Sequence, residues 1–195
     1  MATRKKKDET LEEFETGALR ENKVGKGRSD LMANAILQDV MAYAMVNYFG
    51  KENCINVSSY GTYIALHSEQ YPDMYYQTII SITCMRYADP IKSQNDHGII
   101  CYVINAEEFV RGMAEMSLEL AKHYEKGAVT HGIDNWKKGI PVIGGERGGS
   151  CNDSARRHGD KYLAGYDDED HAISCIWNCV TALWMLKEKK EKNDK

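Results

Sequence analysis

Apolar residues recur at helical spacing near the end of the chain, and this pattern is the clearest structural signal in the sequence. The apolar positions of this stretch are Ala172, Cys175, Ile176, Cys179, Val180 and Leu183. Steps of three and four residues place them on one face of a helix. We therefore expect a helix over about 168–190, with one buried stripe.

Three more helices follow from similar patterns. The longer two are expected over 30–49 and 106–126, where Gly50 and Gly127 stand at the predicted ends. A shorter helix is expected over 153–164. These elements predict a mainly α fold.

The segment 51–105 differs from the rest of the chain. It holds most of the tyrosines and two of the three prolines. Two runs, 75–87 and 98–104, are rich in β-branched and aromatic residues, and a turn-like region rich in Pro, Asn, Asp and Gly separates them. We interpret them as strands of a β-hairpin or small sheet, so the fold class is mainly α with a small β-containing insertion at about 51–105.

Composition limits the function classes. A chain of 195 residues with 43% hydrophobic residues is expected to form one domain over 17–190, preceded by a charged arm at 1–16 and followed by a short tail at 191–195. A net charge of −4 argues against direct binding of nucleic acid. No apolar run reaches the roughly 18 residues of a membrane span, and the charged start is unlike a signal peptide. We therefore expect no membrane contact and a cytoplasmic location.

Four consecutive acidic residues precede the last predicted helix. Asp167 is placed to cap it, with Asp170 three residues later as in a capping box. Acids in a first turn also suit the helix macrodipole. On the helix, His171, Ser174 and Asn178 continue one line from Asp167 beside the apolar stripe. Such a polar line is either hydrogen-bonded structure or the wall of a site.

A second acidic candidate, Glu125, lies near the end of the helix predicted over 106–126. It follows a small apolar face, and a carboxylate near a helix C-terminus opposes the macrodipole. Both features favour a function for Glu125. A second possible metal site is formed by three residues at four-residue spacing, Glu115, Glu119 and His123. The alternative is that they form an exposed helix face.

Three groups of fragments, taken in order, resemble the phage dATP/dGTP diphosphohydrolase-type family, which is related to the MazG-like helical nucleotide pyrophosphatases. The fragments are Gly17-Ala18-Leu19-Arg20 with Gly25-Lys26-Gly27-Arg28-Ser29-Asp30-Leu31; Tyr124-Glu125-Lys126-Gly127-Ala128 with Gly132 and Asn135-Trp136-x-Lys138-Gly139; and Arg157-His158 with the acidic run, His171 and Asn178. The resemblance covers about 17–32 and 106–186. The segment 51–105 has no counterpart in it, Gly159 stands where a bulky apolar residue is expected, and the Glu-Glu-x-x-Glu signature of MazG proper is absent.

The resemblance implies metal-dependent hydrolysis of a purine deoxynucleoside triphosphate, dATP or dGTP, to the monophosphate and pyrophosphate, for control of the nucleotide pool. Mg²⁺ (or Mn²⁺) suits this reaction because it takes carboxylate and phosphate oxygens together. The candidate metal ligands are Glu125, Asp167, Glu169 and Asp170, and the candidate catalytic residues are Glu125, His158 and His171. The candidate nucleotide- or phosphate-binding residues are Lys26, Arg28, Lys126, Asn135, Trp136, Lys138, Arg157 and Asn178.

Assembly and two rival functions complete the expectations. Four helices give a limited shared core, and MazG-like proteins build their sites between chains, so we expect a homo-oligomer, either a dimer or a tetramer. The same pocket in a non-catalytic protein would bind and sequester a nucleotide or a nucleotide signal. A purely structural helical oligomer would bind neither nucleotide nor metal.

Overall fold

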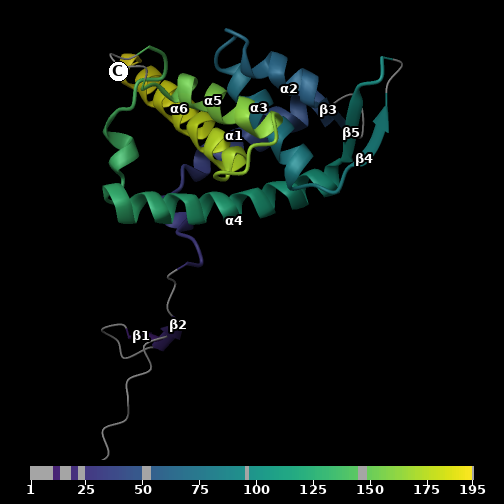
Figure 1. Ribbon diagram of the computed structural model, residues 1–195. Helices are drawn as coiled ribbons and strands as arrows, with labels where there is room; N and C mark the ends of the chain where they lie inside the picture. The colour runs from purple at the N-terminus through teal and green to yellow at the C-terminus, as the bar shows by residue number, and fades with distance from the viewer. Residues whose placement is uncertain are drawn as a thin grey trace, which may run out of the picture.

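The computed structural model describes residues 11–13, 19–21, 25–49, 54–94, 97–144 and 149–194. It is mainly helical with a small sheet, as predicted (Figure 1). The helices are α1 (Asn34–Ala44), α2 (Ser59–Leu66), α3 (Asp73–Arg86), α4 (Ala106–His131), α5 (Cys151–Leu163) and α6 (His171–Asn193), with a π-helical turn η2 (Met45–Phe49) and two 3₁₀ turns, η1 (Ser29–Leu31) and η3 (Asn135–Lys138). The strands are β1 (Leu11–Glu13), β2 (Leu19–Glu21), β3 (Cys54–Ser58), β4 (Ile91–Gln94) and β5 (Ile100–Asn105).

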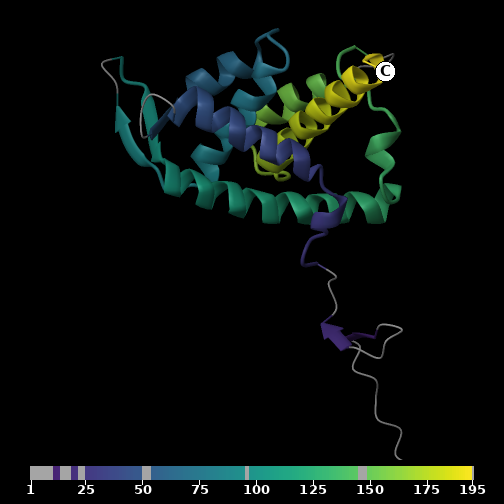
Figure 2. The ribbon, with the colours of Figure 1, turned by 180° about the vertical axis from the view of Figure 1, so that it is seen from behind.

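Helix α6 lies at the centre of the helical packing, where α1, α3, α4 and α5 all contact it. Helices α5 and α6 lie on one face of the body and α1 on the opposite face (Figures 1 and 2). Helix α4 runs along one edge, from the sheet at its start to η3 at its end (Figure 1). This arrangement places α6 directly against α4 and α5 against α6.

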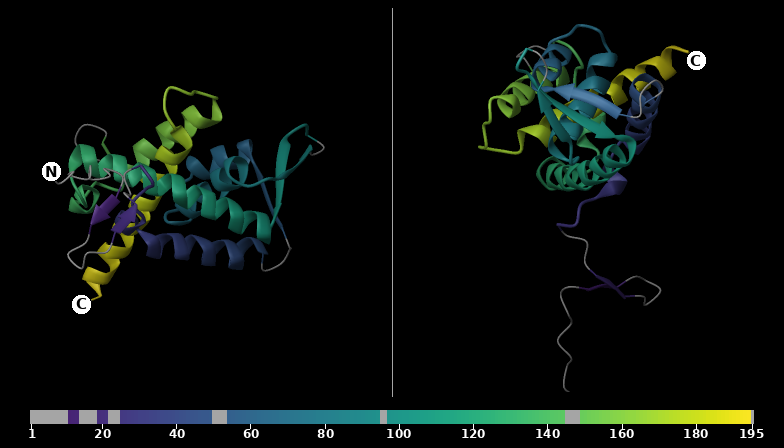
Figure 3. Two further views of the ribbon diagram at one scale, coloured as in Figure 1. Left: turned by 90° about the horizontal axis from the view of Figure 1, so that it is seen from below. Right: turned by 90° about the vertical axis from the view of Figure 1, so that its right-hand side faces the viewer.

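The sheet lies at one end of the body, where β5 leads directly into α4 (Figure 3). It is antiparallel in the order β3-β5-β4, and the register pairs Ile55 with Ile104 and Ile91 with Val103. Ile55 and Ile104 are buried, whereas all four residues of β4 are exposed. The sheet therefore adds one buried face to the core and leaves β4 as an edge.

The strand predicted over 75–87 is wrong, because these residues belong to helix α3. Seven consecutive residues of α3, Thr78 to Cys84, are buried. A helix enclosed on most of its circumference shows no amphipathic period, and β-branched residues then suggest a strand. The second predicted strand, 98–104, is confirmed as β5. Helix α2 is a further element of the insertion that the sequence pattern did not indicate.

Two predicted helix boundaries also shift. Helix α6 begins at His171, and its cap is Asp170 rather than Asp167: Asp170 Oδ1 accepts a 3.1 Å hydrogen bond from the Ile173 N–H. Helix α4 continues through Gly127 to His131 and ends before Gly132, whose φ of +91° suits glycine.

Gly159 lies where α5 packs against α2. A Cβ at this position would lie 2.3 Å from Cδ2 of the fully buried Leu66. Leu66 therefore occupies the space that a bulky apolar residue on α5 would fill.

None of the described helices combines the length and the apolar character that crossing a lipid bilayer requires.

Candidate functional site

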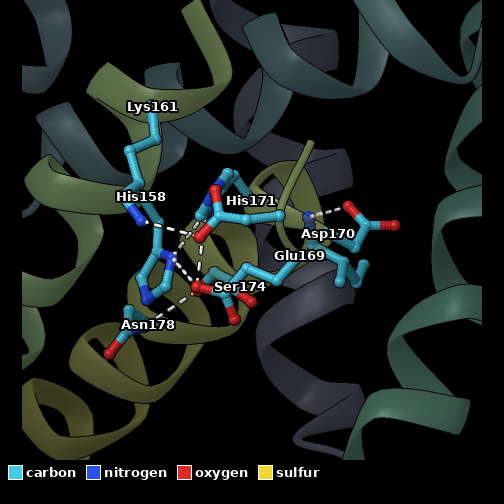
Figure 4. Close-up of polar contacts among 9 residues, drawn as sticks. His158, Lys161, Glu169, Asp170, His171, Ser174 and Asn178 are labelled. Atoms are coloured by element: carbon cyan, nitrogen blue, oxygen red, sulfur yellow. Dashed lines mark hydrogen bonds and ion pairs between the residues drawn. The ribbon is translucent and has the colours of Figure 1, made fainter. Parts of the chain in front are cut away.

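Two imidazoles and a carboxylate converge where α5 meets the start of α6. His158 comes from α5, Glu169 from the loop before α6, and His171 is the first residue of α6. His158 Nδ1 lies 3.0 Å from His171 Nδ1, and Glu169 Oε1 lies 3.2 Å from the first nitrogen and 3.3 Å from the second (Figure 4). Among the described residues, this is the one place where three such side chains bring potential metal ligands within 4.8 Å of one another.

Asp168 fixes the orientation of His171. Asp168 Oδ1 lies 2.8 Å from His171 Nε2, and Oδ2 accepts a 3.0 Å hydrogen bond from Lys161 Nζ. These hydrogen bonds, the one from His171 first, lower the pKa of Asp168 to about 2. The ionised carboxylate is an acceptor, so Nε2 of His171 carries the proton. In the neutral ring, Nδ1 of His171 therefore presents its lone pair to His158 and Glu169.

His158 is held as a neutral imidazole. Burial is the main cause that lowers its pKa; Glu169 opposes the shift, while Arg157, His171 and Lys161 add to it. Its side chain is 14% exposed, compared with 1% for His171. The lowered pKa of His158 favours its uncharged form, which is the state in which imidazole binds a metal or accepts a proton.

The remaining polar residues of the predicted line are engaged in local structure. Asp170 uses one oxygen as the α6 cap and the other to accept a 2.8 Å ion-pair hydrogen bond from Arg86. Asn178 Nδ2 donates a 2.8 Å hydrogen bond to the Ser174 carbonyl, one helical turn earlier (Figure 4). Asp167 is exposed in the preceding loop.

Glu125 lies in a different constellation. Its carboxylate accepts hydrogen bonds from the backbone N–H groups of Gly25 (3.0 Å) and Gly27 (2.9 Å). Lys26 and Arg28 belong to the same turn, and both Nε and Nη2 of Arg28 donate to the Asp30 carboxylate. Two of the three groups of sequence fragments are thus in contact, but the Glu125 carboxylate is not part of the His158 cluster.

The second possible metal site does not form a cluster in the described residues. Glu115 is exposed, and Glu119 accepts a 2.7 Å hydrogen bond from Lys122. His123 turns instead toward the aromatic ring of Trp177, with 5.9 Å between ring centroids.

A cavity of about 530 Å³ opens between the end of α4, η3 and α6. Its aromatic walls are Tyr124, Trp136 and Trp177; the Tyr124 ring lies 5.4 Å from Trp136 and 6.2 Å from Trp177 between centroids. Two predicted nucleotide-binding residues, Lys126 and Asn135, line it as well. The volume is in the range of small-molecule sites, and aromatic walls with few polar groups suit a planar ligand.

His123 lies on the cavity wall within electrostatic range of the carboxylates before α6. It lines the cavity, and its pKa is lowered by burial and then by Lys126, whereas Asp170 and Glu169 raise it. The carboxylates before α6 therefore lie close enough to His123 to act on its charge. The sequence alone did not assign His123 or Trp177 to a nucleotide pocket. Along α4, the cavity is lined by residues 123, 124, 127, 128 and 131. This spacing indicates that they share one face of the helix.

The other predicted cationic contacts lie on the surface around these two features. Arg157 precedes His158 on α5 and is exposed, and Lys138 is exposed at the end of η3. The position of neither side chain by itself indicates a phosphate-binding site.

Comparison with known proteins gives one match. Residues 104–195 match the family model described as dATP/dGTP diphosphohydrolase, N-terminal. No curated protein and no solved structure matches the chain. The matched segment comprises α4, η3, α5 and α6, and so contains the whole His158 cluster and most of the cavity wall. Residues 104–195, a little under half of the chain, are thus similar to the dATP/dGTP diphosphohydrolase family in the part described as N-terminal.

Proposed function

We propose that this protein hydrolyses a purine deoxynucleoside triphosphate, dATP or dGTP, to the monophosphate and pyrophosphate with the help of a divalent metal ion. The family description names a diphosphohydrolase, which is a hydrolase. The observation that carries the proposal is that α6 contributes both to an aromatic cavity, through Trp177, and to an imidazole–carboxylate cluster, through His171, with His123 on the cavity wall within electrostatic range of Glu169.

The cavity is suited to a purine. The rings of Tyr124, Trp136 and Trp177 offer stacking surfaces, and Asn135 at the wall offers an amide for a base edge.

The triphosphate would extend from the cavity toward the cluster. Lys126 lines the cavity, and Arg157 adjoins His158, so both are candidates to neutralise phosphate charge. His158, Glu169 and His171 are the described residues that fit a metal ion, which when bound lowers the pKa of a coordinated water and neutralises phosphate oxygens. His123 is held neutral and can orient a water or accept a proton at the junction.

The test is direct. The purified chain is incubated separately with dATP, dGTP, dCTP and dTTP in Mn²⁺ or Mg²⁺, and pyrophosphate is measured. We expect release with the purine substrates, loss of release in His158→Gln, and wild-type release in the exposed surface variant Glu115→Gln. No pyrophosphate from any of the four substrates with either metal would reject the proposal.

One observation favours the non-catalytic alternative, a protein that binds and sequesters a nucleotide. Glu125 contacts Gly25 and Gly27, so the carboxylates predicted to share a metal do not meet in one place. Intact dATP or dGTP recovered from a heated complex with metal present would favour this alternative over hydrolysis.

We also propose that the chain assembles as a homo-oligomer, a dimer or tetramer. An exposed apolar group on α2, formed by Tyr60, Tyr63 and Ile64, offers one possible contact surface. Light scattering tests this, and a single chain mass at all concentrations would reject it.

A further inference from the structure

We propose that His158, His171 and Glu169 form a binding site for a first-row transition-metal ion of the Mn²⁺ to Zn²⁺ series, with Asp168 as the residue that positions His171. Of the two ions expected for this chemistry, Mg²⁺ and Mn²⁺, the site would thus disfavour Mg²⁺ and retain Mn²⁺. The inference deepens the proposed function by naming the metal class. Its catalytic use rests on that function, but the existence of the site does not.

The spacing of the three ligand atoms fits the first coordination shell of a small ion. Their separations are 3.0, 3.2 and 3.3 Å. Ligands about 2.0–2.1 Å from a tetrahedral ion are about 3.3 Å apart, and ligands about 2.1–2.2 Å from an octahedral ion are about 3.0 Å apart. All three edges fall between these values, so one ion can contact the three atoms with little movement of either helix.

The hydrogen bond behind His171 matches the support that metal-binding histidines have. A histidine ligand usually donates its second ring N–H to a carboxylate, which fixes the tautomer and raises the basicity of the metal-binding nitrogen. Asp168 accepts from His171 Nε2 at 2.8 Å, so the lone pair of Nδ1 faces His158 and Glu169. Lys161 holds the other oxygen of Asp168, which keeps this carboxylate in a supporting position.

The pairing of the neighbouring charges leaves the Glu169 carboxylate available to bind a cation. Asp168 is paired with Lys161 and Asp170 with Arg86, whereas Glu169 contacts the two imidazoles. The macrodipole at the start of α6 opposes a cation. The four carboxylates that precede His171 offset it, and Arg157 and Lys161, which lower the pKa of His158, are neighbouring positive charges.

The donor set decides the class of ion. Mg²⁺ prefers oxygen ligands and retains several waters, whereas imidazole nitrogens suit Zn²⁺, Ni²⁺, Co²⁺ and their neighbours. Two nitrogens and one oxygen therefore disfavour Mg²⁺ as the resident ion. Three protein ligands also leave coordination positions for water or a phosphate oxygen, as in catalytic metal sites.

The competing explanation is a simple hydrogen bond. With Nδ1 of His171 as acceptor, a proton on Nδ1 of His158 satisfies the 3.0 Å contact without any ion. Metal titration separates the two possibilities, because the hydrogen bond alone gives no stoichiometric binding.

The experiment uses the full chain, stripped with EDTA and titrated with Co²⁺ by visible absorption and with Zn²⁺, Mn²⁺ and Mg²⁺ by calorimetry. We expect one Co²⁺ per chain with nitrogen- and oxygen-type bands, competition by Zn²⁺, and no competition by millimolar Mg²⁺. Cys54 and Cys101 are partly exposed thiols, so thiolate charge-transfer absorption would place the ion elsewhere and would overturn the proposal. No Co²⁺ binding, or equal competition by Mg²⁺, would overturn it as well.

Variants assign the site. Asp168→Asn should weaken Co²⁺ affinity roughly 10–100-fold while retaining the absorption bands, because loss of the supporting carboxylate leaves all three ligands in place. His158→Gln and Glu169→Gln should weaken it further and change the bands.

His67→Gln, which removes another partly exposed imidazole, is the matched control and should bind as the wild type does. Circular dichroism checks folding, and unchanged affinity in folded His158→Gln and Glu169→Gln would refute the site. Stoichiometric Co²⁺ binding without pyrophosphate release would retain the site and reject the proposed function.

Discussion

Glu125 Oε2 accepts a 2.9 Å hydrogen bond from the backbone N–H of Gly27, 98 residues earlier in the chain. The other oxygen accepts from Gly25, and the Arg28 N–H donates to the Ala121 carbonyl at 3.2 Å. A carboxylate in the last turns of α4 thus anchors the glycine-rich turn that precedes η1. The unfavourable macrodipole at this end of α4 is offset by two backbone N–H donors.

Replacing Glu125 by glutamine should reduce stability by about 1–2 kcal/mol, because one charge-assisted acceptor becomes an N–H₂ group that faces a donor. Urea unfolding of the full chain measures the change. Glu115→Gln, an exposed substitution on the same helix, should shift the unfolding free energy by less than about 0.5 kcal/mol. If Glu125→Gln is as stable as this control, the anchoring role is wrong.

The glycine-rich turn offers a matched pair of substitutions. Gly25 (φ +78°) and Gly27 (φ +87°) both have left-handed backbone conformations, but only a Cβ on Gly27 meets atoms of α4, with Ala121 Cβ at 2.9 Å. Gly25→Ala should cost about 1 kcal/mol for the backbone alone. Gly27→Ala should cost about 2–3 kcal/mol because overpacking adds to this. Thermal or urea unfolding compares the two, and equal losses would show that close packing on α4 is unimportant.

Several features of the fold were predictable because their signals are local. The stripe on α6 and the start of α4 follow from helical periodicity, and β5 follows from a short β-branched run. Helix α3 was not predictable in this way, because its burial on most sides removes the period that distinguishes a helix from a strand. The convergence of His158, Glu169 and His171 depends on the turn between α5 and α6. The hydrogen bond between Glu125 and Gly27 joins residues that are 98 positions apart. Neither geometry can therefore be predicted from residue spacing.

The contact between Gly159 and Leu66 predicts a coupled effect on stability. Gly159→Ala places a Cβ 2.3 Å from Leu66 Cδ2 and should destabilise the protein by about 1–3 kcal/mol. Leu66→Ala removes that clash and should itself cost about 2–5 kcal/mol through the cavity that it leaves. In the Leu66→Ala background, Gly159→Ala should be neutral or stabilising. A double-mutant cycle by urea unfolding measures the coupling, and additive effects would contradict this packing.

Trp177 gives the sharpest test of where a purine binds. It lines the cavity together with Tyr124 and Trp136, whereas Trp184 packs on Trp136, at 4.9 Å between centroids, without lining the cavity. Loss of one stacking ring costs roughly 1–3 kcal/mol per base, so Trp177→Leu should weaken binding of a fluorescent dATP analogue about 5–150-fold. Trp184→Leu, which removes a neighbouring indole from the same helix, should weaken it less than about threefold once folding is confirmed by circular dichroism. Equal losses in both variants would indicate a general packing effect and would move the base site away from this cavity.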